Sequence, residues 1–121
     1  MSVPVDLAAL HALVDELGPE ALLATVTAED TPHLVSVLVA GGDGKGHLTM
    51  GGGRRTRANI ALNPRVTLLW PSVRDGAYRL IVDGTATANA DETVTVEPTF
   101  AVLHRIAGVD GDGPNCVPVE G

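Results

Sequence analysis

Cysteine and aromatic residues are scarce in this chain of 121 residues. The single cysteine, Cys116, excludes a disulfide within the chain and a metal cluster built on cysteines. The only aromatic residues are Trp70, Tyr78 and Phe100, too few for the stacking platform that binds single-stranded nucleic acid. Apolar residues still make up 45% of the chain, so its interior must consist mainly of Val, Leu, Ile and Ala, which favours strands.

Long apolar runs are missing as well. No stretch reaches the roughly 18 consecutive apolar residues that read as a membrane span. The first 18 residues lack a basic segment and carry Asp6, Asp15 and Glu16 within their apolar stretch, so they predict a helix of the mature protein and not a secretion signal. We therefore expect a cytoplasmic protein with no membrane partner.

Acidic residues outnumber basic ones, and the net charge of −7 disfavours nucleic acid and anionic lipid as partners. The charges are unevenly distributed, because no acidic residue lies between Asp43 and Asp75. That window holds six of the eight basic residues, namely Lys45, Arg54, Arg55, Arg57, Arg65 and Arg74. A local positive field in an acidic protein suits a small anion. Charge alone leaves open the alternative of a solvated turn with ordinary surface arginines.

Periodicity and turn residues predict two helices and about six strands. We expect helices over 5–17 and 54–62 and strands over 21–28, 33–40, 47–50, 65–70, 78–88 and 93–106. Pro71 should end one strand and Pro98 should interrupt the last, while Asp83-Gly84 marks a bulge or bend. Residues 107–121 form a tail rich in glycine and proline, either disordered or laid over a neighbour.

The short antiparallel strands favour a mainly β fold, because closing them into a barrel removes open sheet edges. The length fits a single domain over residues 1–121.

The segment GGGRRTR, from Gly51 to Arg57, is the strongest candidate for chemistry. A strand that runs into three glycines and then a helix is a physically sensible anion site. Glycines let backbone N–H groups approach a ligand, and the helix N-terminus carries partial positive charge. Arginine can hold phosphate oxygens bidentately. The spacings of the Walker and Rossmann loops are absent, so nucleotide hydrolysis and dinucleotide binding are poor interpretations.

The order of strand 35–39, strand 47–50, GGGRRTRANIALNPRVTLLW and YRLIVDGTATA resembles the pyridoxamine 5′-phosphate oxidase-like split barrels. The likeness spans roughly residues 5–106, and its most specific part is the arginine-bearing turn, the short helix and the sequence Asn63-Pro64-Arg65-Val66. The resemblance implies a six-stranded antiparallel split β-barrel of the FMN-binding type. In actinobacterial branches of the family the deazaflavin F420 often replaces the flavin.

The resemblance also implies where a cofactor would lie. In that family the second barrel strand runs along the flavin ring, so Val35, Ser36 and Val37 would offer it backbone groups and small side chains. Thr49 and Met50 would flank the ring or the ribityl chain.

The family's basic pair after the third strand binds the terminal phosphate, and Arg54 and Arg55 occupy that place. Matching from the downstream Asn-Pro pair instead puts Thr56 where relatives have lysine and Arg57 where they have a small residue. The likeness therefore leaves open which of these residues hold phosphate. It also leaves open the choice between FMN, the family default, and F420.

The family likeness further implies a homodimer with the cofactor in a groove between the subunits. We hypothesise a flavin- or deazaflavin-dependent oxidoreductase that moves a hydride between the cofactor and an unknown small organic substrate. Such chemistry belongs mostly to the cofactor, so no catalytic side chain is assigned. The alternatives are a protein that binds or sequesters the cofactor without turnover, which the scarcity of aromatics favours, and a barrel that serves only as a dimer module.

No metal site is expected from the histidines. They lie on separate predicted elements and lack the close spacing of metal ligands; they are His11, His33, His47 and His104.

Overall fold

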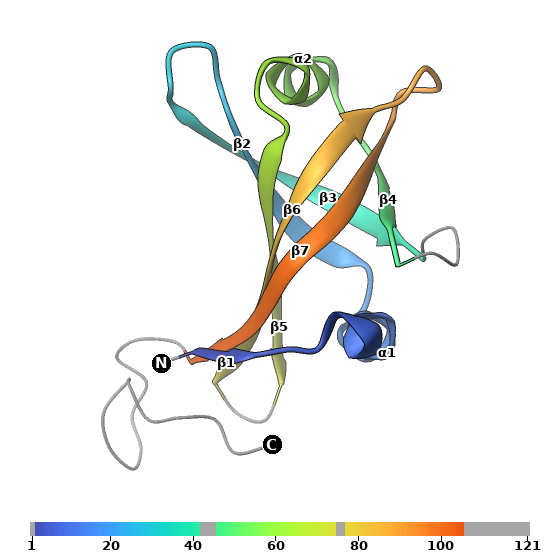
Figure 1. The fold of residues 1–121 in the computed structure, drawn as a ribbon, viewed down its shortest axis with the longest axis vertical. Helices are drawn as coiled ribbons and strands as arrows, with labels where there is room; N and C mark the ends of the chain where they lie inside the picture. Colours follow the sequence, from blue (N-terminus) through green and yellow to red (C-terminus); the bar gives the residue numbers. More distant parts are fainter. Residues whose placement is uncertain (1, 42–45, 75–76, 106–121) are drawn as a thin grey trace.

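The computed structural model describes residues 2–41, 46–74 and 77–105, and Figure 1 shows their arrangement. The predicted tail over 107–121, with Cys116, lies outside the described residues. In chain order the elements are β1 (Ser2–Pro4), the 3₁₀ turn η1 (Leu7–Ala9), α1 (Leu10–Leu17), β2 (Glu20–Val26), β3 (Pro32–Ala40), β4 (Leu48–Gly51), α2 (Arg54–Leu62), β5 (Arg65–Arg74), β6 (Tyr78–Ala88) and β7 (Thr93–Arg105).

The strands form one antiparallel sheet that closes on itself. Their order is β1-β7-β4-β3-β2-β5-β6, and an additional pairing of β6 with β7 joins the two sides. Six strands thus make the barrel, and β1 is an extra strand on β7. The predicted split-barrel fold is confirmed.

Side chains that point inward from the strands fill the barrel, and the two helices close its ends, with α1 at the lower end of Figure 1 and α2 at the upper end. Buried leucine and valine side chains dominate this core. At the α1 end, the buried Trp70 donates its indole N–H to the carbonyl of Gly18 at 3.0 Å. At the α2 end, Asn59 donates from Nδ2 to Oγ1 of the buried Thr25, also at 3.0 Å. Each helix is therefore fixed to the barrel by apolar packing and by a hydrogen bond, which is part-buried at α1 and buried at α2.

The structure departs from the sequence prediction at the two prolines. β5 continues past Pro71 to Arg74, with a shift in register after Trp70 that accommodates a residue without an N–H group. β7 runs through Pro98, which faces Gly84 at a second register shift, so the bulge predicted at Asp83-Gly84 is confirmed. Within the described ranges, no helix is long and apolar enough to cross a membrane.

Candidate functional site

The glycine-arginine segment leaves the barrel at the end of β4 and enters α2. Gly53 is the N-cap of α2, and no side chain caps the helix there. The first helical hydrogen bond runs from the N–H of Arg57 to the carbonyl of Gly53 at 2.9 Å, so the N–H groups of Arg54, Arg55 and Thr56 have no acceptor among the described residues. Such an uncapped helix start is a place where an anion is stabilised.

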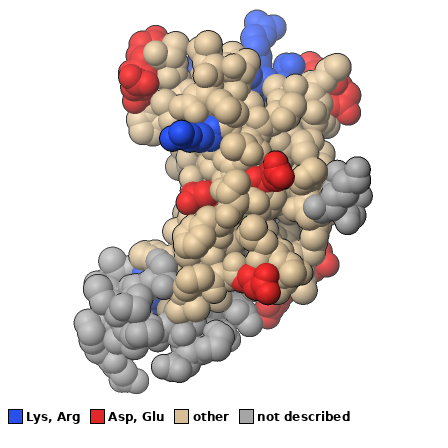
Figure 2. Space-filling model, in the orientation of Figure 1, with Lys and Arg blue, Asp and Glu red and all other residues tan. Residues whose placement is uncertain are grey.

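Four neighbouring side chains on α2 differ in their availability to a ligand. Arg54 and Arg55 are exposed, and neither forms a hydrogen bond or an ion pair with a described residue. Thr56 is only 2% exposed, with its side chain turned to the protein interior. Arg57 is half-buried and bound to neighbouring groups. Figure 2 shows basic side chains at the end of the molecule where Figure 1 places α2.

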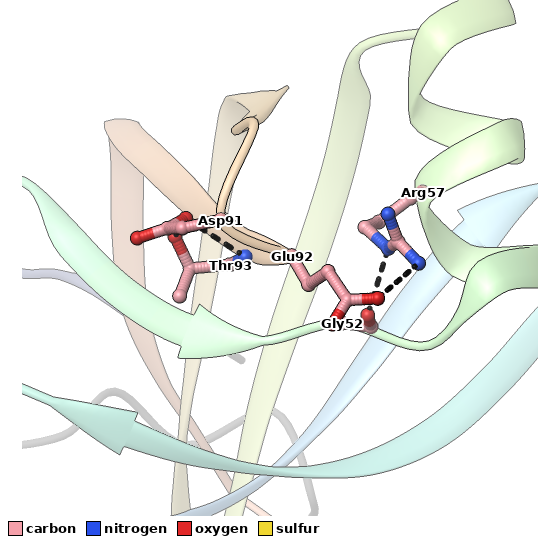
Figure 3. Close-up of polar contacts among 5 residues, drawn as sticks. All are labelled: Gly52, Arg57, Asp91, Glu92 and Thr93. Carbon is pink, nitrogen blue, oxygen red and sulfur yellow. Dashed lines mark hydrogen bonds and ion pairs between the residues drawn. The ribbon is translucent and has the colours of Figure 1, made fainter.

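Arg57 connects α2 to two other parts of the chain, as Figure 3 shows. Its Nε donates to the carbonyl of Gly52 at 3.0 Å, and its Nη2 lies 3.4 Å from Oε1 of Glu92. Gly52 also donates its N–H to the carbonyl of Glu92 at 3.3 Å. Both backbone groups of Gly52 are thus occupied. A Cβ atom at this position would lie 2.6 Å from Cγ2 of Val94, so the close approach of the backbone to β7 requires glycine here.

The β6–β7 turn, residues 89–93, is itself held by several hydrogen bonds. Asn89 donates from Nδ2 to the hydroxyls of Thr93 and Thr95, at 3.0 and 2.8 Å. Asp91 accepts from the hydroxyl and the N–H of Thr93, and these hydrogen bonds lower the pKa of Asp91 below its usual value. The turn therefore presents Glu92 to Arg57 from an ordered backbone.

The predicted residues of β3 and β4 lie on two faces of the barrel wall, some facing the core and some facing outward. Val37 and Met50 are buried in the core, and Val35 packs against it, so only their backbone is available to a ligand outside the barrel. Ser36 is exposed and Thr49 half-exposed on the outer surface. Of the nine predicted residues, Ser36, Thr49, Arg54 and Arg55 offer side chains to the outer surface without being held by a described partner.

β3 has a free edge next to the glycine segment. It pairs with β2 from Pro32 to Leu38, but with β4 only at Val39 and Ala40. Val39 donates its N–H to the carbonyl of Pro19, on the β2 side of the strand. Backbone N–H groups point to alternate edges along a strand, so those of Ser36 and Leu38 point to the edge away from β2. No strand among the described residues pairs with that edge before Val39. Polar backbone groups are thus open to a ligand or a partner.

Two surface grooves differ in their relation to these residues. One of about 350 Å³ is lined by six residues of β2 and β3 and by Pro71, and it includes Ser36 and Val37. A larger groove of about 500 Å³ lies across β2, β5 and β6 and contains Arg65, Thr67 and Asp83, but none of the nine predicted residues. The smaller groove is the stronger candidate because two of the nine predicted residues, Ser36 and Val37, line it. Within the described part of the chain, no three side chains of His, Cys, Asp or Glu gather as metal ligands.

Two features of the site were not predicted from the sequence. Glu92 lies 35 positions from Arg57, and no local pattern links them. The exposed leucines Leu34 and Leu38 on the outer face of β3 did leave a signal, since HLVSVLVA is apolar on both faces of the strand. A strand with two apolar faces indicates that something covers both.

Comparison with known proteins identifies the family. The sequence model of the pyridoxamine 5′-phosphate oxidase family matches residues 14–119. An uncharacterized protein of Mycobacterium bovis is 40% identical to the chain over an alignment of 120 residues. The alignment covers 88% of this chain and 84% of that protein.

Solved structures share the fold at low sequence identity. A Listeria innocua protein, provisionally assigned as a pyridoxamine 5′-phosphate oxidase, has a TM-score of 0.65 at 17% identity, covering 80% of this chain and 96% of its own. An F420 reductase has a TM-score of 0.56 at 22% identity, with coverages of 69% and 90%. An FAD-binding protein of Mycobacterium smegmatis has a TM-score of 0.60 at 16% identity, with coverages of 87% and 100%. Because the family sequence model matches residues 14–119 and the chain folds as a closed split barrel, the chain belongs to the pyridoxamine 5′-phosphate oxidase family.

Proposed function

We propose that the protein binds FMN at the junction of β4 and α2 and acts as an oxidoreductase on a small organic substrate. The observation that carries the proposal is the uncapped start of α2, where three N–H groups have no acceptor among the described residues and Arg54 and Arg55 are exposed beside them. This donor set fits a phosphate, because a phosphate accepts hydrogen bonds on several oxygens and is stabilised by the helix N-terminus.

The proposed roles follow from the side each residue presents. Arg54 and Arg55 hold the phosphate with the N–H groups of the first helical turn. The open edge of β3 at Ser36 and Leu38 offers backbone donors and acceptors to the polar edge of a flavin ring, and Thr49 offers a hydroxyl to the chain between ring and phosphate. Val35, Val37 and Met50 support this surface from inside the barrel. A bound flavin supplies the hydride chemistry, while the chain binds and orients it.

A homodimer is part of this proposal. Leu34 is 61% and Leu38 67% exposed on the outer face of β3. Ser36, between them, pairs with Leu22 of β2, and Leu69 of β5 and Ile81 of β6 continue that row across the sheet. An apolar surface of this kind marks an interaction site, and a second copy of the chain is the partner that would cover it. The groove that includes Ser36 would then lie at the subunit interface.

F420 is the alternative cofactor, and binding without turnover is the alternative function. Both cofactors carry phosphate on their polar arm, so the α2 site suits either, and an F420 reductase and an FAD-binding protein share the fold. No catalytic side chain is assigned at the site, which suits chemistry that belongs to a cofactor and also suits a carrier. A chain with one cysteine needs no oxidising compartment, so we propose that it works in the cytoplasm.

Titration of the purified protein with FMN and with F420, read by fluorescence, tests the proposal. We expect micromolar or tighter binding of at least one of them, and weaker binding of riboflavin, which lacks the phosphate. Absence of binding to both would refute the binding function and with it the enzyme. Where binding occurs, rapid reoxidation of the reduced complex by candidate substrates supports the enzyme, and stable retention of the reduced cofactor supports the carrier.

A further inference from the structure

We propose that Arg57 is a positioning residue that holds the glycine segment in the conformation that receives a phosphate, without contacting the ligand itself. This inference rests on the proposed function of the α2 site. Arg57 is the arginine of the segment whose head group is already bound, to the carbonyl of Gly52 and the carboxylate of Glu92, whereas Arg54 and Arg55 are exposed.

The glycine segment has more conformational freedom than an ordinary loop. Gly51, Gly52 and Gly53 follow one another, and glycine adopts more backbone conformations than any other residue. Free of tertiary contacts, such a run would sample many arrangements of its N–H groups. A ligand that needs one arrangement binds more weakly in proportion to the fraction of molecules that have it.

Hydrogen bonds at Gly52 restrict that freedom. Gly52 is bound on both sides, by its N–H to the carbonyl of Glu92 and by its carbonyl to Nε of Arg57. The planar guanidinium reaches Gly52 and the carboxylate of Glu92 with different nitrogens, so one side chain joins α2, the glycine segment and the β6–β7 turn (Figure 3).

Glu92 has a backbone conformation that is unusual for a residue with a side chain. Its φ of 70° is a left-handed conformation that favours glycine. A side chain here has a conformational cost, which its contact with Arg57 offsets in part. Because the Glu92 carboxylate is 76% exposed, the ion pair by itself is weak, and the shorter hydrogen bond to Gly52 is the main restraint.

The inference separates two kinds of arginine in one short sequence. Arg54 and Arg55 bind the ligand through their charge, whereas Arg57 holds the glycine segment in its binding conformation. Lysine at position 57 would keep the positive charge, but its single ammonium group cannot reproduce the planar fork that joins Gly52 to Glu92. Charge and geometry can therefore be tested separately with Arg57→Lys.

The experiment compares Arg57→Lys and Arg57→Ala with Arg65→Lys as the matched charge-preserving control, since Arg65 is exposed and lines the groove across β2, β5 and β6, outside the proposed site. We expect both Arg57 variants to bind FMN about tenfold more weakly, the effect of a competent fraction that falls to about 0.1. Binding of riboflavin should be unchanged, because it makes no phosphate contact, and Arg65→Lys should bind FMN like the wild type. Retention of wild-type FMN affinity by Arg57→Lys would overturn the inference, since charge alone would then account for the role of Arg57.

Amide hydrogen exchange in the ligand-free proteins gives a readout that needs no cofactor. We expect the N–H of Gly52 to exchange faster in both Arg57 variants than in the wild type, and at the wild-type rate in Arg65→Lys. Unchanged exchange at Gly52 in Arg57→Ala would overturn the inference even if FMN binding fell. If the wild-type protein binds no FMN, the proposed function fails, while the exchange rates still decide whether Arg57 holds the segment.

Discussion

Replacing both Arg54 and Arg55 with alanine should weaken FMN binding strongly while leaving the ligand-free protein as stable as before. Both side chains are exposed and form no hydrogen bond or ion pair with a described residue, so their removal costs the fold little. A guanidinium that meets a phosphate at an exposed site contributes about 1–1.5 kcal/mol, between the roughly 0.2–1 kcal/mol of an exposed ion pair and the roughly 1.5–3 kcal/mol of a hydrogen bond to a charged group. Two such contacts correspond to about 2–3 kcal/mol, or a dissociation constant about 30- to 150-fold higher.

The assay is a fluorescence titration of wild type and double variant with FMN and, in parallel, with riboflavin. The loss should appear for FMN and be nearly absent for riboflavin, since only FMN carries the phosphate. Raising the salt concentration should weaken FMN binding to the wild type more than to the variant, because screening acts on the charges that the variant lacks.

Thermal unfolding of the ligand-free proteins is the control, and we expect the free energy of unfolding to differ by no more than about 0.5 kcal/mol, as for other exposed substitutions. A large loss of stability would show that the arginines are structural. Equal weakening for FMN and riboflavin would refute the reasoning too, since it would place the effect away from the phosphate.

Two further substitutions test the packing and the assembly. Gly52→Ala should lower the free energy of unfolding by about 1–3 kcal/mol, because the new methyl group meets Val94. Gly51→Ala is the control and should change it little, because its Cβ would lie in open space. Thermal or urea unfolding measures both variants, and equal effects would show that the contact with Val94 does not determine the loss. Leu38→Asp should convert the proposed dimer to a monomer, measured by light scattering after size exclusion, since the interface would bury an unpaired carboxylate. Leu62→Asp, at the end of α2, should leave the dimer intact. A dimeric Leu38→Asp protein would show that this face of β3 is not the dimer interface.

The architecture could largely be predicted from local patterns. The bounds of α2 follow from helix-forming residues between Gly53 and Asn63-Pro64, and those of β6 from apolar alternation, and both are as predicted. β1 was missed because three residues are too few to show a period. Pro71 and Pro98 were given too much weight as strand ends, since register shifts accommodate them within continuous strands.

The site could be predicted only in part. The position of the glycine-arginine segment before a helix follows from the sequence, because both neighbouring elements have clear local signals. Which arginine is free does not follow, since the state of Arg57 depends on Glu92 and Gly52, which only the folded barrel brings together. The inward direction of Val37 and Met50 likewise depends on the barrel's register, which long-range pairing sets.

The most direct test of the phosphate site is to map backbone amide chemical shifts while the protein is titrated with FMN. Our account predicts the largest changes at the N–H groups of Arg54, Arg55 and Thr56, with a second group of changes at Ser36 and Leu38 on the free edge of β3. Changes concentrated in the groove across β2, β5 and β6, or no saturable change at all, would contradict it.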